Sequence, residues 1–425
     1  MEMLLVAVFV FGYLGIVLEH TISIDKSSSA LLTGALCWTL VTFMMHDSGH
    51  VNEELYHHTS EIAGILFFLM GAMTIVELID TYDGFDIITH QIKTRDQVKL
   101  LWIISVLAFF LSAILDNLTT TIVMVTLVKK LIDKADLRLL FVGIIVVAAN
   151  AGGAWSPMGD VTTTMLWIGG QITAGNIVIQ LIVPSLVCLI IPLVVVTRQV
   201  KGTLAPKVLE ETTGQPISEK DKQIVFFTGI GGLLFVPIFK TVTHLPPFMG
   251  MLLSLGILWA VTELLLKNKE EEVKKNLSVY RALEKIDMPS VLFFLGILLA
   301  VSALQTVGIL TSAANWLTDT FQNQTVIVTL IGLLSSVVDN VPLVAASMGM
   351  YSLDQFPTDD PFWELLAFCA GTGGSALIIG SAAGVAAMGM EKINFFWYVK
   401  KISWLALLGY FAGIATFLLM KGLFH

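Results

Sequence analysis

The chain has 425 residues, of which 56% are hydrophobic and only 13% are charged, with a mean hydropathy of +0.83 and a formal net charge of −9. A soluble domain of ordinary composition carries about 25% charged residues, so that class is excluded. Repeated apolar runs have the length of about 20 residues that crosses a bilayer as a helix. The composition therefore predicts an all-α integral membrane protein that contacts lipid, and its acidic balance gives no reason to expect nucleic acid as a partner.

In chain order, we expect about ten spanning segments. Their predicted ranges are 3–19, 29–45, 62–79, 139–172, 176–197, 223–242, 248–266, 290–306, 362–391 and 402–420. Glycine-rich sequence interrupts 139–172 and 362–391, and we expect broken helices there. Two further apolar stretches, 100–132 and 325–350, are interrupted in the middle, and their halves are judged too short to cross the bilayer alone. We expect them to form two re-entrant helical hairpins.

The basic residues predict the orientation of these segments, because cytoplasmic loops of membrane proteins carry an excess of Lys and Arg. The segments assigned to the cytoplasm on this basis are 20–28, 80–99, 129–138, 198–222, 267–289 and 392–401. Basic residues flank hairpin 100–132, so it is expected to enter from the cytoplasm, whereas acidic residues flank hairpin 325–350, so it is expected to enter from outside. The chain is then an inverted-repeat transporter fold, with repeats at 1–197 and 223–425 and a cytoplasmic linker at 198–222.

An Asp-Asn pair lies at the centre of each predicted hairpin, and a glycine-rich break follows each pair. The four segments are SAILDNLTTT (112–121), NAGGAWSPMGDVTTT (150–164), SSVVDNVPLV (335–344) and GTGGSALIIGSAAG (371–384). An ionisable side chain at bilayer depth costs about 2.5–3.5 kcal/mol and indicates a functional site. Irregular backbone at that depth is tolerated where it is buried in protein or lines a cavity. The duplicated pattern predicts a transporter whose site lies where the two copies meet.

Oxygen-bearing side chains are concentrated in these four segments. They are Asp116, Asn117, Thr119, Thr120, Thr121, Asn150, Ser156, Asp160, Thr162 and Thr163 in the first half, and Asp339, Asn340, Ser375 and Ser381 in the second. Aligning the two copies places Asp160 opposite Ser381 and Thr119 opposite Pro342, so the first half contributes two acids and most of the hydroxyls. We expect the coupling chemistry there. Asp339 is either a helper or second proton site, or a purely structural cap of its half-helix.

The charge of this group predicts its cargo. We expect no Lys or Arg at the depth of the acids, so the site should attract cations rather than anions. A carboxylate removed from water disfavours a bare charge, so each acid is expected to hold either a proton or a metal ion, and not both. Carboxylates and unwound backbone carbonyls suit a small hard cation. Competition between proton and cation is sufficient for exchange.

At its paired motifs, LDNLTTT and NAGGAWSPMGDVTTT above all, the chain resembles the NhaD-type sodium/proton antiporters of the ion transporter superfamily over essentially all 425 residues. The resemblance implies a multi-pass, homodimeric protein of the bacterial inner membrane that exports cytoplasmic Na+ or Li+ in exchange for external protons by alternating access, without a resident cofactor. It also implies Na+ binding at Asp116, Asn117, Asn150, Asp160 and Thr163. Related dicarboxylate and citrate carriers have Ser-Asn-Thr tips, so the Asp-Asn pairs favour cation/proton exchange.

Two other functions stay open at this point. One is an anion carrier of the same superfamily that moves arsenite or a dicarboxylate with Na+, and the other is a cation channel. The sequence has no nucleophile–base pair, phosphate loop or metal-ligand histidine cluster, so we do not expect an enzyme. Glu61 and Glu77 are interpreted as either entrance or pH-sensing residues or as solvated interfacial residues, and the histidines of the outer segment 46–61 as pH sensors or plain exposed residues.

Overall fold

The computed structural model describes residues 1–45, 48–89, 92, 94–204 and 217–424. Within these ranges the regular elements are helices, with one isolated antiparallel bridge between Asp96 and Thr203. Nine of the described helices are long and apolar enough to cross a membrane. The predicted class, an all-α integral membrane protein, is confirmed.

The helices follow one another along the chain in a single order. They are α1 (Glu2–Val17), α2 (Glu19–Ile22), α3 (Lys26–Met45), α4 (Ser48–Thr81), α5 (Asp86–Thr89), α6 (Gln97–Leu115), α7 (Asn117–Leu131), α8 (Ala135–Gly153), α9 (Val161–Ile168), α10 (Ala174–Thr197), α11 (Glu219–Thr243), α12 (Pro247–Leu266), α13 (Glu271–Leu277), α14 (Val279–Lys285), α15 (Met288–Thr306), α16 (Ile309–Phe321), α17 (Gln324–Leu334), α18 (Asn340–Met350), α19 (Pro361–Gly373), α20 (Ala382–Glu391), α21 (Phe395–Tyr398), a π-helical turn (Val399–Ser403) and α22 (Trp404–Phe424).

The interrupted segments lie where the sequence predicts them. Segment 100–132 is divided between α6 and α7, and 325–350 between α17 and α18. Segment 139–172 is divided between α8 and α9, and 362–391 between α19 and α20. Each interruption begins or ends at a residue of the duplicated motifs.

Two details of the prediction are wrong. Helix α6 has 19 residues and is long enough to cross a membrane, because it starts before the apolar run, at a turn capped by the Asp96 side chain, which accepts a hydrogen bond from Lys99 N. The outer segment 46–61 is not a loop from residue 48 onward, since α4 starts there and continues for 34 residues. Charged residues do not interrupt a helix as proline does.

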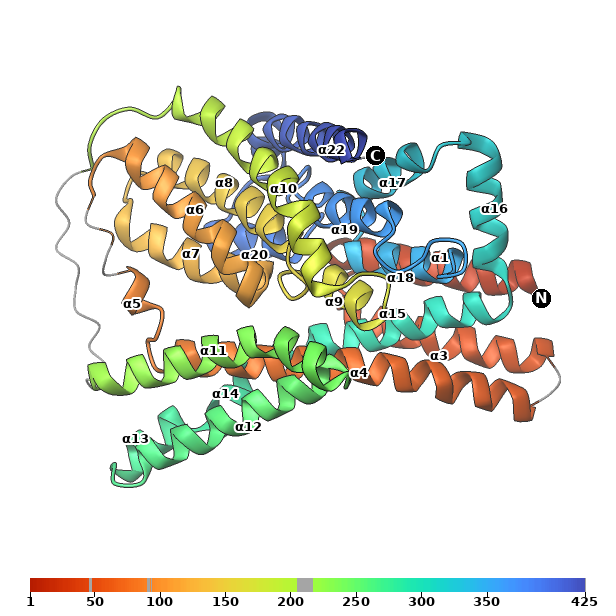
Figure 1. Ribbon diagram of the computed structural model, residues 1–425, viewed down its shortest axis with the longest axis horizontal. Helices are drawn as coiled ribbons and strands as arrows, with labels where there is room; N and C mark the ends of the chain where they lie inside the picture. Colours follow the sequence, from red (N-terminus) through yellow and green to blue (C-terminus); the bar gives the residue numbers. More distant parts are fainter. Residues whose placement is uncertain (46–47, 90–91, 93, 205–216, 425) are drawn as a thin grey trace.

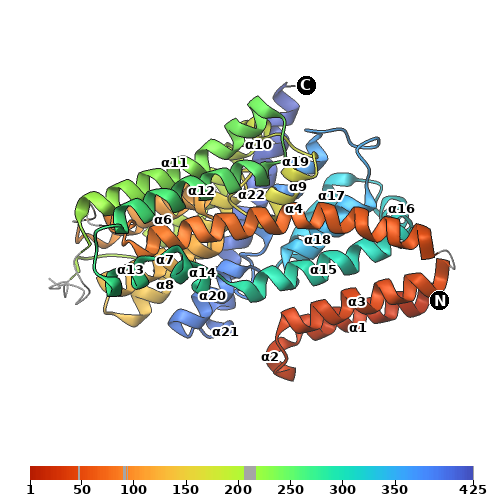
Figure 2. The same cartoon turned by 90° about the horizontal axis from the view of Figure 1, so that it is seen from below.

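Two groups of helices make up the molecule (Figure 1). Helices α3, α4, α11, α12 and α15 occupy its lower part in that view, and helices α6–α8, α10, α17, α19 and α22 occupy the upper part, with α1, α9 and α18 at mid-height between them. Figure 2 shows α1 and α3 at one edge, beside α15. Helix α8 is buried on every face from Phe141 onward, and α19 from Phe362 onward. The two interrupted helices α8 and α19 thus form the protein-surrounded core in which irregular backbone is tolerated.

Each hairpin packs on its interrupted helix through corresponding contacts. Ser112 Oγ donates to the Ala149 carbonyl at 2.6 Å, and Ser335 Oγ donates to the Ala370 carbonyl at 2.9 Å. A Cβ atom on Gly152 would lie 2.1 Å from the Phe109 carbonyl oxygen. In the second half, a Cβ atom on Gly373 would likewise lie 1.9 Å from the Gly332 carbonyl oxygen. Of the predicted linker 198–222, residues 205–216 lie outside the described residues.

Candidate functional site

Four helix N-termini meet near the centre of the molecule, and each has a polar side chain as its cap. Asp116, Asp160, Asp339 and Ser381 accept hydrogen bonds from backbone N–H groups in the first turns of α7, α9, α18 and α20, respectively. The first turn of a helix has unsatisfied N–H groups and a partial positive charge. The two hairpin tips and the first glycine-rich break therefore create the positions that stabilise carboxylates inside the protein.

Asp160 is the centre of the polar network. Its carboxylate accepts hydrogen bonds from Asn117 Nδ2 at 2.5 Å and from Asn340 Nδ2 at 3.2 and 3.3 Å. The backbone N–H and the hydroxyl of Thr162 donate to the same carboxylate at 2.9 and 2.7 Å. Only 2% of Asp160 is exposed. Amides from both Asp-Asn pairs thus meet at one buried acid.

Asn150 connects this network to the second interrupted helix. Its Oδ1 accepts from Asn117 Nδ2 at 3.0 Å, and its Nδ2 donates to the hydroxyls of Ser375 and Ser381 at 2.9 Å each. Asn150 is fully buried. Because a buried amide without partners is costly, these bonds fix the position of α8 relative to the α19–α20 break.

Asp116 lies beside the network and has its own partners. Its carboxylate accepts from the backbone N–H and the hydroxyl of Thr119 at 2.7 and 3.0 Å. The residue has φ 104° and ψ 163°, a region that only glycine adopts readily, at a cost of order 1–3 kcal/mol for other residues. The backbone is thus strained at the acid itself.

The predicted hydroxyls differ in their availability to a ligand. Thr163 Oγ1 donates to the Asp160 carbonyl at 2.9 Å, and Ser156 Oγ donates to the Ala113 carbonyl, so both are engaged with backbone. In the part of the chain that the structure describes, the buried hydroxyls of Thr120 and Thr121 have no hydrogen-bond partner. Thr120 lies one turn after Asn117 on α7. The Thr163 hydroxyl, although it donates its proton, still has lone pairs that can bind a cation.

A cavity of about 80 Å³, which we call the central cavity, adjoins the three acids. Its wall includes Asp116, Asp160, Asp339, Asn117, Asn340 and Lys26. The expectation that no basic residue reaches the acids is therefore wrong. Lys26 Nζ lies 3.9 Å from Asp339 Oδ2, because α3 starts at Lys26 and packs along α15, next to the tip that holds Asp339.

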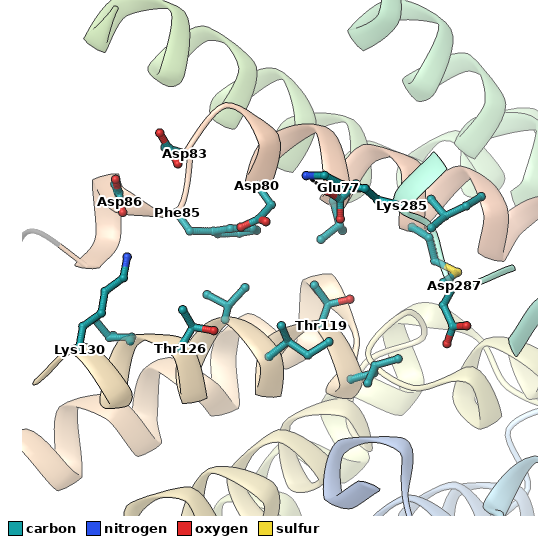
Figure 3. A pocket seen from close by; sticks show the side chains of 17 residues that line it. Glu77, Asp80, Asp83, Phe85, Asp86, Thr119, Thr126, Lys130, Lys285 and Asp287 are labelled. Carbon is teal, nitrogen blue, oxygen red and sulfur yellow. Dashed lines mark hydrogen bonds and ion pairs between the residues drawn. The ribbon is translucent and has the colours of Figure 1, made fainter. Parts of the chain in front are cut away.

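A second cavity of about 290 Å³, which we call the acidic cavity, lies between α4–α5 and α7. Figure 3 shows Glu77, Asp80 and Asp83 on one side of it and Thr119 and Thr126 on the other. The two cavities share Met73, Leu118 and Thr119 in their walls. Glu77 is thus not in the central group, and its carboxylate accepts a hydrogen bond from Lys285 Nζ at 2.8 Å.

Glu61 is also outside the central group. It lies on α4 with 63% of its side chain exposed, and its carboxylate is 3.6 Å from His58 Nδ1. His57, His58 and Glu61 bring one potential ligand atom each within 4.8 Å of one another. The same three residues are in the outer segment whose histidines are interpreted from the sequence as pH sensors or plain exposed residues.

Two further acids with buried side chains lie outside the motifs and are not among the predicted site residues. Glu364 is fully buried on α19, accepts a hydrogen bond from Asn176 and lies 2.8 Å from Lys421 Nζ. Glu391 pairs with Arg138 at 2.7 Å. Both acids lie within the predicted segment 362–391, so an intramembrane acid was the available signal.

The interrupted helices and the acids at their N-termini define an integral membrane transporter. The chain matches the family described as "Citrate transporter" over residues 3–371. It is 49% identical to "Sodium/proton antiporter 1" of Arabidopsis thaliana, over 98% of this chain and 72% of that protein. It is 31% identical to "Na(+)/H(+) antiporter NhaD" of Alkalimonas amylolytica, over 99% of this chain and 91% of that protein.

A third relative, "Sodium/proton antiporter 2" of Arabidopsis thaliana, is 47% identical over 96% of this chain and 97% of its own length. The chain belongs to the NhaD-type sodium/proton antiporters within the citrate transporter family. The matched relatives are named as transporters, which agrees with the class of protein that the sequence predicts. The nine described helices of membrane-spanning length make this chain a multi-pass membrane protein.

Proposed function

We propose that this chain exchanges Na+ or Li+ for H+ across the membrane, exporting the cytoplasmic cation as external protons enter. The observation that carries the proposal is the convergence of Asp116, Asp160 and Asp339 on one small cavity at the ends of interrupted helices. Carboxylates in such a place are stabilised by either a proton or a cation. The two ions therefore take turns at the same oxygens.

The amides of Asn117 and Asn340 suit this alternation. Both donate N–H groups to Asp160, which satisfies a carboxylate that holds no metal ion. Rotation of an amide about its terminal bond would present its carbonyl oxygen instead, and that oxygen can bind Na+ but cannot donate to a bare carboxylate. The proposed sodium ligands are Asp116, Asn117, Asn150, Asp160 and Thr163, with Thr120 and Asn340 nearby.

We further propose that the halves 1–197 and 223–425 are inverted repeats that alternate access to this site. The corresponding contacts of Ser112 and Ser335, and of Gly152 and Gly373, support a common origin of the two hairpins. Broken helices from two inverted halves that meet at a central site are an architecture of secondary transporters. The acidic cavity, with Glu77 in its wall, is the proposed cytoplasmic entrance, because it adjoins the central cavity at Thr119.

Location and assembly stay predictions from the sequence. The location in a bacterial inner membrane stays a prediction, because the chain matches both bacterial and plant proteins over nearly its whole length. The homodimer stays a prediction as well.

One observation favours the rival, an anion carrier. Lys26 in the wall of the central cavity is a cationic partner of the kind that a carboxylate substrate needs. Three aspartates face it across the same cavity, however, and Asp339 already engages it at 3.9 Å. Since the acids outnumber the ammonium, cation exchange is the better account.

Proton movement in everted membrane vesicles tests the proposal. Addition of Na+ or Li+ should release a preformed proton gradient with the native chain, and Asp116→Asn and Asp160→Asn should each abolish that release. Citrate, other dicarboxylates or arsenite should leave the gradient unchanged. Cation-driven release that persists in both variants would refute the site assignment, and transport of an anion without proton movement would establish the rival.

A further inference from the structure

Lys26 has no part in the exchange of Na+ and H+ as proposed above, although it reaches the central cavity. Its Nζ lies 3.9 Å from Asp339 Oδ2, and the two side chains are 29% and 23% exposed. Among the described residues that line this cavity, Lys26 is the single basic residue, and three aspartates line the same cavity. A lysine in such surroundings affects the binding of any cation there.

The structure holds this ammonium group in a defined place. Ser27 Oγ donates to the Pro289 carbonyl at 2.8 Å, which ties the start of α3 to the start of α15. Lys26 Nζ lies 4.7 Å from the centroid of the Phe293 ring, a cation–π distance. A Cβ atom on Gly296 would lie 2.4 Å from the Ala30 carbonyl carbon, so α3 and α15 are in close contact. Lys26 is therefore on a closely packed helix pair and not on a loose loop.

The two Asp-Asn pairs differ in their need for such a partner. Asp116 accepts two hydrogen bonds from Thr119, one of them from the hydroxyl. Asp339 accepts one backbone hydrogen bond, from Val341 N at 3.1 Å. The residue that corresponds to Thr119 is Pro342, which has no hydroxyl to donate. The ammonium of Lys26, 3.9 Å from Asp339 Oδ2, provides a positive charge at the tip that lacks this hydroxyl donor.

We propose that Lys26 is a built-in counter-ion that neutralises Asp339, so that the exchange of Na+ and H+ takes place at Asp116 and Asp160. This inference rests on the proposed exchange function. With the pair formed, two carboxylates of the cavity are left to be neutralised by Na+ or by protons. Lys26 is thus a positioning residue, and Asp339 is needed chiefly because it cancels the charge of Lys26.

A charge-removal series in proteoliposomes tests this inference. Asp339→Asn leaves an uncompensated ammonium in the wall of the cavity that contains the proposed cation site. It should raise the half-saturating Na+ concentration about tenfold or more, because like charges that share a small cavity inside a protein repel strongly. Lys26→Met combined with Asp339→Asn should bring that concentration back to within about threefold of the native value. Lys26→Met alone should lower it, since Asp339 is then free to attract cations.

The matched control is Lys220→Met combined with Asp339→Asn. Lys220 is exposed at the start of α11, so its loss removes one positive charge from the protein but not from the cavity. This control should not rescue Asp339→Asn. Asparagine keeps the cap of α18, and elution of each variant as a single species in gel filtration verifies folding.

The outcomes separate the inference from the proposed function. A double variant no better than Asp339→Asn, or an Asp339→Asn variant equal to the native chain, would overturn the counter-ion role while the native exchange still stands. Absence of Na+-driven proton movement in the native chain would overturn the proposed function. In that case, calorimetric titration of the detergent-solubilised variants with NaCl would still report the pair, because rescue of Na+ binding needs no transport.

Discussion

The two hairpin tips have the same residue pair, Asp-Asn, but they differ in backbone conformation and in the partners of the Asp carboxylate. In the first, a single residue, Asp116, separates α6 from α7 and has φ 104°. In the second, the longer segment 335–339 separates α17 from α18, and Asp339 has φ −49°. The Asp116 carboxylate accepts a hydrogen bond from the Thr119 hydroxyl, three residues further along the chain. The Asp339 carboxylate instead forms an ion pair with Lys26, which is distant in sequence. Under the proposed function, the strained backbone is at the tip where the ions exchange, and the unstrained second tip has the electrostatic role.

The largest expected effect on transport comes from removing the Asp160 carboxylate, because the aligned position in the second half has no acid. Asp160→Ser introduces the residue that occupies the corresponding position in the second half, and serine retains the cap of α9. Na+-driven proton movement should fall about 100-fold or more, since the variant loses a carboxylate that we propose to bind both ions. Ser381→Ala, which removes one acceptor of Asn150, should cost only a few-fold. Rates in everted vesicles check both, and equal losses in the two variants would break the comparison.

A large effect on stability is expected where each hairpin lies closest to the interrupted helix of its own half. A methyl group on Gly152 or Gly373 would meet a backbone carbonyl oxygen at 2.1 or 1.9 Å, so Gly152→Ala and Gly373→Ala should each destabilise the protein by about 3 kcal/mol. The control is Gly256→Ala on α12, where a Cβ atom meets nothing within 4 Å and helix propensity favours alanine. Thermal unfolding of the detergent-solubilised protein measures all three. A tolerated substitution in one half only would show that the two hairpins are packed differently.

A smaller and symmetric effect is expected for the two buried serines. Ser112→Ala and Ser335→Ala each remove a hydrogen bond to a buried carbonyl on the neighbouring interrupted helix. The two losses should be similar, about 1 kcal/mol each. Unfolding midpoints compared between the variants measure them. If one serine proves dispensable, the correspondence between the halves does not extend to these contacts.

The smallest expected effect is the relief of strain at the first tip. Asp116→Gly should be more stable than Asp116→Asn by about 1 kcal/mol, because glycine adopts φ 104° readily. The order should reverse at the second tip, where Asp339→Gly gains nothing from positive φ and loses the side-chain cap of α18. Both pairs lack the acid, and glycine loses the side-chain cap at both tips, at a cost of about a few tenths of a kcal/mol. Opposite orders of the unfolding midpoints at the two tips therefore report the backbone strain. The same order at the two tips would contradict the assignment of strain to Asp116.

Much of the fold and the central group follows from local sequence. Asp116, Asp160 and Asn340 stand out because polar residues inside apolar runs are costly unless they meet other polar groups. Their duplicate spacing predicts that they share a site, and hydrogen bonds join Asp160 to Asn117 and Asn340.

The errors concern contacts between segments that are distant in sequence. Lys26 lies at the end of a predicted cytoplasmic segment and looked like an ordinary orientation signal. Its approach to Asp339 depends on the close packing of α3 against α15, which periodicity does not predict. Glu364 and Lys421 were separately visible as charges, but their pairing depends on how α19 meets α22. The start of α6 was misplaced because the cap at Asp96 lies outside the apolar run.

The central claim, that Na+ and protons compete for the same carboxylates, is tested most directly by proton release from the purified protein. NaCl is added to the detergent-solubilised chain in a weakly buffered solution near neutral pH, with choline chloride as the control for ionic strength. We predict that Na+, and not choline, releases protons from the native chain, and that Asp116→Asn and Asp160→Asn reduce this release. Sodium binding to the native chain without any release of protons would contradict the account.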